Sequence, residues 1–177
     1  MPGIDFFEYV RDEDIIDGIP SFGICDDPGE LPAFISYDRS VDTWIAEVLN
    51  PGLQRIQFLP VDKHIPLRRH DGTEAMRCDA MLLTSPLHTK GIVVFIELKD
   101  VLQSKWSEER KHAVEQLGKT IEFFSEYHLL ESYEKRLAYV ANRRGRPHAN
   151  RAYTSDIQRF WNEYRVRLRF KANIDFS

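Results

Sequence analysis

The stretch Gly91-Ile-Val-Val-Phe-Ile-Glu-Leu-Lys99 decides the fold of this chain. Its five consecutive apolar residues are typical of a strand buried on both faces, at the centre of a sheet with helices packed against it. The run ends without a turn residue, so Glu97 and Lys99 point to the same face. A carboxylate and an ammonium are costly to desolvate there unless they pair or bind something. The strand alone leaves open whether they form a local ion pair or part of a site.

Length and composition indicate one ordinary globular domain. The chain has 177 residues, of which 42% are hydrophobic and 29% charged, enough for a full core. No basic leader with an apolar core and no apolar run of about 20 residues is present in the sequence, so neither a signal peptide nor a membrane span is expected. Two cysteines are too few for a disulfide scaffold. We therefore expect a cytoplasmic protein.

The charge is unevenly distributed along the chain. Residues 135–171 hold 11 Lys or Arg against two acidic residues, a net charge of +9, whereas the remainder carries −13. This polarisation favours a polyanionic partner for the basic part, although a solvated basic face has the same composition.

Residues 40–49 predict a helix that begins at Ser40 and ends before Asn50-Pro51-Gly52. Its apolar residues recur at helical spacing: Val41, Trp44, Ile45 and Val48. Glu47 lies on the flank of this stripe, where a glutamate is most often solvated. The preceding residues, 17–32, are rich in turn formers and are expected to be a loop.

Three strands are predicted next, over residues 63–69, 76–83 and 92–99, joined as an antiparallel meander through the turn at Asp71-Gly72. Asp79 falls inside the middle strand among apolar neighbours. Propensity and burial both disfavour an aspartate in that position, so it is a second candidate functional residue.

The rest of the chain alternates between helices and strands. A long helix is expected from Ser107 to about Tyr127, with Gln116 beside its apolar stripe, which comprises Val114, Leu117, Ile121 and Phe124. A strand over 135–141, a basic loop over 142–147, a helix from Ser155 to Tyr164 and a strand over 165–171 follow. Phe160 and Trp161 are expected in the core rather than as base-stacking platforms.

This order of residues and elements resembles the PD-(D/E)XK nuclease superfamily, whose restriction-endonuclease-like fold has an αβββαβ core. The resemblance covers about residues 40–142, with 1–39 as an N-terminal extension and 143–177 as a basic C-terminal helix and strand of the same single domain. Asp79 and Glu97-Leu98-Lys99 match the motif, and Glu47 and Gln116 match acidic and glutamine positions of many members. Cys78 replaces the proline of the family name. An α/β (α+β) fold with a mixed central sheet flanked by helices is implied.

The resemblance implies phosphodiester hydrolysis that depends on Mg²⁺ or Mn²⁺. Asp79, Glu97, the Leu98 carbonyl and Glu47 would be metal ligands, since Mg²⁺ prefers oxygen donors. Lys99 would orient or deprotonate the attacking water or stabilise charge on the phosphate, with Gln116 nearby. We expect a DNA endonuclease that is guided by the structure of its substrate, belongs to a larger defence or repair system, or depends on a homodimer or a partner protein to find its target. The alternatives are a non-catalytic nucleic-acid-binding or protein-interaction module that keeps the fold, and an α/β domain in which Glu97 and Lys99 merely pair.

Seven basic residues are candidate nucleic-acid contacts: Arg143, Arg144, Arg146, Arg165, Arg167, Arg169 and Lys171. Phosphate contacts hold a nucleic acid without reading its sequence. The alternation in 165–171 is strict, however, and charges on an exposed edge strand also prevent aggregation. Both interpretations remain open at this point.

Overall fold

The computed structural model describes residues 6–27, 29–40, 43–69, 71–84, 91–144 and 153–177. These form a mixed α/β fold built on two sheets. The six-stranded sheet has the order β1-β5-β6-β7-β8-β9, and the four-stranded sheet has the order β10-β4-β2-β3. The predicted fold class, α/β with a mixed central sheet, is therefore confirmed.

The elements have the following bounds. The strands of the larger sheet are β1 (Ile15–Ile16), β5 (Ile56–Pro60), β6 (Ala80–Thr84), β7 (Gly91–Lys99), β8 (Tyr133–Asn142) and β9 (Arg167–Phe170). Those of the smaller sheet are β2 (Ser21–Cys25), β3 (Phe34–Ser36), β4 (Ala46–Leu49) and β10 (Asn173–Asp175). The helices are α1 (Trp106–Glu126) and α2 (Thr154–Tyr164), and 3-10 turns cover Phe6–Tyr9 and Asp12–Asp14.

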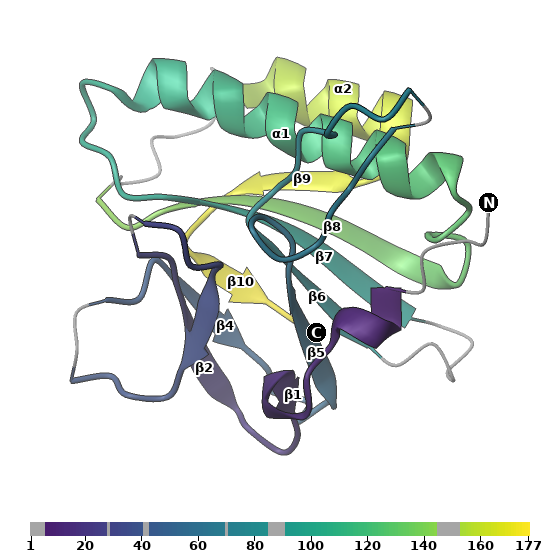
Figure 1. The fold of residues 1–177 in the computed structure, drawn as a ribbon. Coiled ribbons are helices and arrows are strands. Elements are labelled where there is room, and N and C mark those ends of the chain that lie inside the picture. Colours follow the sequence, from purple (N-terminus) through teal and green to yellow (C-terminus); the bar gives the residue numbers. More distant parts are fainter. Residues whose placement is uncertain (1–5, 28, 41–42, 70, 85–90, 145–152) are drawn as a thin grey trace.

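β7 is the central strand, as its apolar run predicts. It pairs antiparallel with β6 and parallel with β8, and eight of its nine residues are buried. Val93 and Phe95 point into a core shared with the helices, whereas Val94, Ile96 and Leu98 point into a second core. Figure 1 shows what forms these cores: α1 and α2 cover one face of the six-stranded sheet, and the four-stranded sheet covers the other. The prediction of helices flanking the sheet thus holds for one face only.

The antiparallel meander exists, but its first strand lies elsewhere. β5, at residues 56–60, pairs with β6 and β6 with β7, whereas the predicted strand over 63–69 is wrong. That segment contributes one isolated bridge between Arg68 and Glu74, closed by the Asp71 turn. Pro66 removes a backbone donor there, and residues 63–69 bury Ile65 and Leu67 under α1 without a continuous ladder.

Two further predictions, both within the first 50 residues, are wrong. Residues 17–32 include β2 rather than only loop, and the helix predicted over 40–49 is instead the strand β4. β4 pairs with β2 and, through Val48 and Ile174, with the C-terminal strand β10. The second layer is therefore assembled from both ends of the chain, which local periodicity cannot reveal.

The burial of β7 makes a prediction about stability. Phe95 is completely buried and its ring packs edge-on against Phe124, with 5.8 Å between ring centroids. Phe95→Ala should lower the free energy of unfolding by about 3–5 kcal/mol, measured by urea denaturation. Leu102→Ala, at a side chain that is 60% exposed, is the control and should change it by less than about 0.5 kcal/mol. Equal losses in the two variants would contradict this account of the core.

Candidate active site

The structure brings Asp79 and Glu97 together at one end of the six-stranded sheet. Ala80 pairs with Ile96 in the register of β6 and β7, so Asp79, one residue before β6, lies opposite Glu97. Met81 and Phe95 point to the helix-covered face, and the alternation of a strand places Asp79 and Glu97 on that face too. The Asp79 Oδ2 atom accepts a hydrogen bond from the Leu98 N–H at 2.6 Å. Asp79 and Glu97 thus lie opposite each other on neighbouring chain segments, close enough for the charge of Asp79 to raise the pKa of Glu97.

Glu97 is fully buried and only half satisfied. Its Oε1 atom accepts a hydrogen bond from the Lys99 Nζ atom at 2.9 Å. Its Oε2 atom is buried without a hydrogen-bond partner among the described residues. Burial and the negative charge of Asp79 raise the pKa of Glu97 well above its usual value, against the influence of Lys99. A buried acceptor left in this state costs free energy unless a proton or a cation satisfies it.

Lys99 carries the positive charge of the site. Its side chain is 14% exposed and also lies 4.0 Å from Glu109 on α1. Burial disfavours the ammonium, but the carboxylates of Glu97, Asp79 and Glu109 outweigh that effect, and the pKa of Lys99 is raised. The local ion pair between Glu97 and Lys99 is therefore real, and Lys99 is a stable cation at neutral pH.

Two acidic residues near the site were not predicted. Burial raises the pKa of Asp79 to about 6, opposed by the Leu98 N–H and reinforced by the charges of Asp26 and Asp62. Asp62 lies directly beside Asp79 in space, since its N–H donates to the Asp79 carbonyl at 3.3 Å. Asp26 directly follows β2, a strand that the sequence analysis placed in a loop. The signal that could have identified them is an acidic residue shortly after the end of a strand, β2 for Asp26 and β5 for Asp62.

Helix α1 fixes the segment that carries Asp79. The Cys78 N–H donates to the Thr120 hydroxyl at 2.7 Å, and the Gln116 Nε2 atom donates to the Arg77 carbonyl at 3.3 Å. A proline at position 78 would have no N–H to give, so this contact requires a residue other than proline there. Gln116 thus lies beside the site as predicted and contacts the backbone two residues before Asp79.

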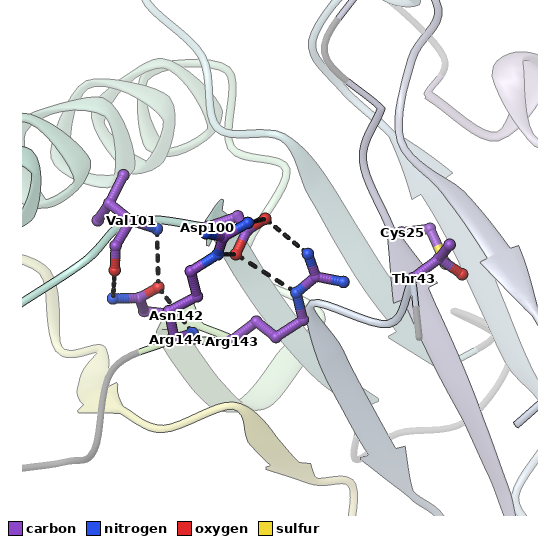
Figure 2. A network of polar contacts seen from close by, with 7 residues as sticks. All are labelled: Cys25, Thr43, Asp100, Val101, Asn142, Arg143 and Arg144. Atoms are coloured by element: carbon purple, nitrogen blue, oxygen red, sulfur yellow. Dashed lines mark hydrogen bonds and ion pairs between the residues drawn. The ribbon is translucent and has the colours of Figure 1, made fainter. Parts of the chain in front are cut away.

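The chain that leaves β7 is pinned to the end of β8 (Figure 2). The Asn142 side chain clamps Val101, accepting from its N–H at 3.1 Å and donating to its carbonyl at 3.0 Å. Asp100 binds the guanidinium groups of Arg143 and Arg144, each through a nitrogen–oxygen distance of 2.6 Å. These two predicted phosphate contacts lie beside the candidate site but already neutralise Asp100. Arg146, predicted with them, lies outside the described residues.

Glu47 is not part of this cluster, and the prediction that a helix carries it is wrong. In β4 the side chains of Ala46 and Val48 point into the core between the sheets, so Glu47 faces the opposite side. There it pairs with the Arg39 Nη2 atom at 2.6 Å. On the same face the Trp44 ring covers Gly23, leaving no room for a Cβ atom. Both sheets and the core between them separate Glu47 from Asp79.

The basic residues of the last strand lie on the edge strand β9 and close to it. Arg165 and Arg167 approach the Trp161 ring, and Arg169 donates to the Tyr139 hydroxyl at 3.1 Å. Lys171 is exposed, while Leu168 and Phe170 are buried. The predicted alternation is confirmed; its role in nucleic-acid binding stays a prediction.

The possible metal ligands at this end of the sheet are few. Among the described residues, no group of three or more His, Cys, Asp or Glu side chains is arranged to hold a metal ion. Two carboxylates do converge, however, and Mg²⁺ is usually bound by one or two carboxylates together with water and substrate oxygens. The half-satisfied Glu97 fits such a cation. Leu98 acts here through its N–H, and a metal bond to its carbonyl stays a prediction.

Comparison with known proteins adds no relative. No family model, no curated protein and no solved structure matches the chain. Within the described residues, none of the helices combines the length and apolar character needed to cross a membrane.

The raised pKa of Asp79 makes the stability of the native state depend on pH. Because the native carboxyl keeps its proton up to about pH 6, whereas an unfolded aspartate releases it near pH 4, the native state binds more protons between these values. Stability therefore falls as the pH rises through this window. Asp79→Asn, which can still accept from Leu98, should be more stable than the unaltered protein by about 1–3 kcal/mol at pH 8 and nearly equal at pH 4.

Urea denaturation across this pH range checks the effect. The control is Asp71→Asn, because hydrogen bonds from Thr73 lower the pKa of Asp71. Its substitution should destabilise at pH 8 and lose that effect at low pH. An Asp79→Asn effect that is independent of pH would contradict the assigned proton.

Proposed function

We propose that the chain is a metal-dependent phosphodiester hydrolase acting on DNA as an endonuclease, of the PD-(D/E)XK type. The observation that carries the proposal is the convergence of Asp79 and the half-satisfied Glu97, with Lys99 bound to the latter. The strand order supports it as well. Three antiparallel strands, a helix and a parallel strand follow one another as β5, β6, β7, α1 and β8, which is the order that the resemblance implies after its first helix; in place of that helix the chain forms β4.

Asp79 and Glu97 would hold a Mg²⁺ or Mn²⁺ ion. When bound, such a cation supplies Lewis acidity and lowers the pKa of a coordinated water. The protein itself leaves both carboxylates poorly neutralised, because burial raises the pKa of each. Metal binding must displace the proton of Asp79, whose pKa is raised to about 6, so affinity should rise with pH through that region.

Lys99 would stabilise negative charge on the phosphate. Its pKa is raised, which favours the ammonium over the free amine and therefore electrostatic stabilisation over proton abstraction. Thr120 and Gln116 would act as positioning residues, because their contacts are to the backbone of residues 77 and 78. Glu47 has no place in this site.

The second candidate is a non-catalytic nucleic-acid-binding or protein-interaction module. The Glu97–Lys99 ion pair favours it, because that pair neutralises one carboxylate oxygen without any metal. The two candidates differ in whether the protein binds divalent metal and cleaves.

Cleavage tests the catalytic residues. In Mg²⁺ or Mn²⁺, with plasmid, linear, single-stranded and branched DNA as substrates, Lys99→Ala and Asp79→Ala should each reduce the rate by at least about 10²-fold. Glu47→Ala is the control and should retain the rate, since Glu47 lies on the outer face of the second sheet. Circular dichroism verifies that each variant is folded. Retained cleavage in either site variant would refute the assignment, and no cleavage by the unaltered protein on any substrate would favour the second candidate.

Metal binding gives an independent measurement. A metal present at ten times its dissociation constant stabilises the native state by about 1.4 kcal/mol, which thermal unfolding with and without Mg²⁺ or Mn²⁺ detects. The stabilisation should be larger at pH 8 than at pH 5 and should disappear in Glu97→Gln. An equal response in Glu97→Gln and in Glu47→Gln would place the metal elsewhere.

A further inference from the structure

A hollow of about 700 Å³ lies at the opposite end of the sheet from the candidate active site. Its lining comes from the starts of β7 and β8, the end of α2 and the start of β9. The residues that matter for its chemistry are Ile92, Lys135, Arg136, Trp161, Arg165 and Arg167. Glu134 is the acidic side chain among those that line it. The hollow therefore combines four cations with an aromatic ring and an apolar residue.

Trp161 is the exposed aromatic of this hollow. Its neighbour Phe160 is fully buried, whereas Trp161 is 43% exposed, so the expectation that both lie in the core is wrong for Trp161. The guanidinium carbons of Arg165 and Arg167 lie 5.7 and 5.8 Å from the centre of its ring. An exposed indole with two guanidinium groups over its ring offers an aromatic surface and positive charge at the same place.

The backbone at Arg165 is held in an unusual conformation. Its φ is 56°, in the left-handed region, where it ends α2 and its N–H donates to the Trp161 carbonyl at 3.2 Å. Glycine is the usual residue in that position, because a side chain costs roughly 1 kcal/mol or more there. The chain thus carries a strained arginine at a helix end where a glycine would fit, and the guanidinium of that arginine lies over Trp161.

We propose that this hollow binds a single-stranded segment of nucleic acid, with a base stacked on Trp161 and phosphates held by Arg165, Arg167, Lys135 and Arg136. An unpaired base is required, because a base within a duplex has its faces covered by its neighbours. Stacking on aromatic rings within a basic groove is the general mode of binding single strands. The inference rests on the proposed function only for the choice of a nucleic acid as the natural ligand.

The position of the hollow defines what it would hold. Ile92 lines the hollow and Lys99 lies at the active end of the same strand, seven residues away, or roughly 23 Å at 3.3 Å per residue. That separation corresponds to about seven steps of a B-form strand at 3.4 Å per step. The hollow would therefore hold an unpaired flank of the substrate and leave the phosphodiester to the Asp79 and Glu97 end.

Binding is measured by fluorescence anisotropy of a labelled 20-nucleotide oligothymidylate in EDTA, so that neither metal nor cleavage contributes. Trp161→Ala should weaken binding by about 5- to 150-fold, the range for one lost stacking contact. Arg167→Ala should weaken it and reduce the slope of log K against log salt by about 0.7. Tyr37→Ala and Lys111→Ala, at an exposed aromatic and an exposed cation outside the hollow, are the matched controls and should bind as the unaltered protein does.

Arg165→Gly separates binding from folding. Glycine relieves the left-handed backbone, so this variant should be at least as stable in urea while binding the oligonucleotide more weakly. A structural role for Arg165 would not lower affinity in a stabilised protein.

Three outcomes would overturn the proposal. The first is unchanged binding in both Trp161→Ala and Arg167→Ala, and the second is equal competition by adenosine monophosphate, which would make this a mononucleotide site. The third is unchanged binding together with aggregation of Arg167→Ala in size-exclusion chromatography, which would assign the charges to edge protection. Cleavage without dependence on the hollow overturns this proposal alone, and hollow-dependent binding without cleavage overturns the proposed function alone.

Discussion

The burial of β7 on both faces is the constraint on which the rest of the structure depends. A strand with an unbroken apolar run needs a cover on each side, and this chain supplies two different ones. Helices α1 and α2 cover the face to which Val93 and Phe95 point, and the four-stranded sheet covers the face of Val94 and Ile96. Because the strand stays buried to its last residues, Glu97 emerges where water cannot solvate it. The chemistry of the site follows from this packing.

Sequence reasoning succeeded where one segment determines its own environment. The apolar run of 92–96 predicted the central strand, and the stripe of Val114, Leu117, Ile121 and Phe124 predicted α1, because each pattern reports its own burial. It failed at residues 40–49, where Trp44, Ile45 and Val48 also fit helical spacing. The strand forms there because Val48 pairs with both Phe22 and Ile174. Pairing with Ile174, 126 residues away, cannot be detected from the local spacing of apolar residues.

The same distinction between local and long-range signals separates the site residues that were predicted from those that were not. Asp79, Glu97 and Lys99 stood out as charges inside apolar segments, which is a local anomaly that a sequence displays. Glu47 was selected from a helix that does not form, so its position failed with the helix. Asp26 and Asp62 were missed because each follows a strand that was placed elsewhere or not predicted. Trp161 was missed because an amphipathic helix with two adjacent aromatics does not reveal which of them the sheet covers.

The energetics of Glu97 argue that its burial serves more than the fold. A buried ion pair is often no more stable than an apolar pair of the same volume, so Glu97 and Lys99 are not required for packing beside Ile96 and Leu98. A pair kept for structure alone is expected to satisfy all its polar atoms. Here one carboxylate oxygen lacks a partner among the described residues, a second carboxylate lies opposite, and the negative charges of Asp26 and Asp62 add to the repulsion. Each of these features destabilises the protein by itself, and a bound cation would reverse the sign of all of them at once.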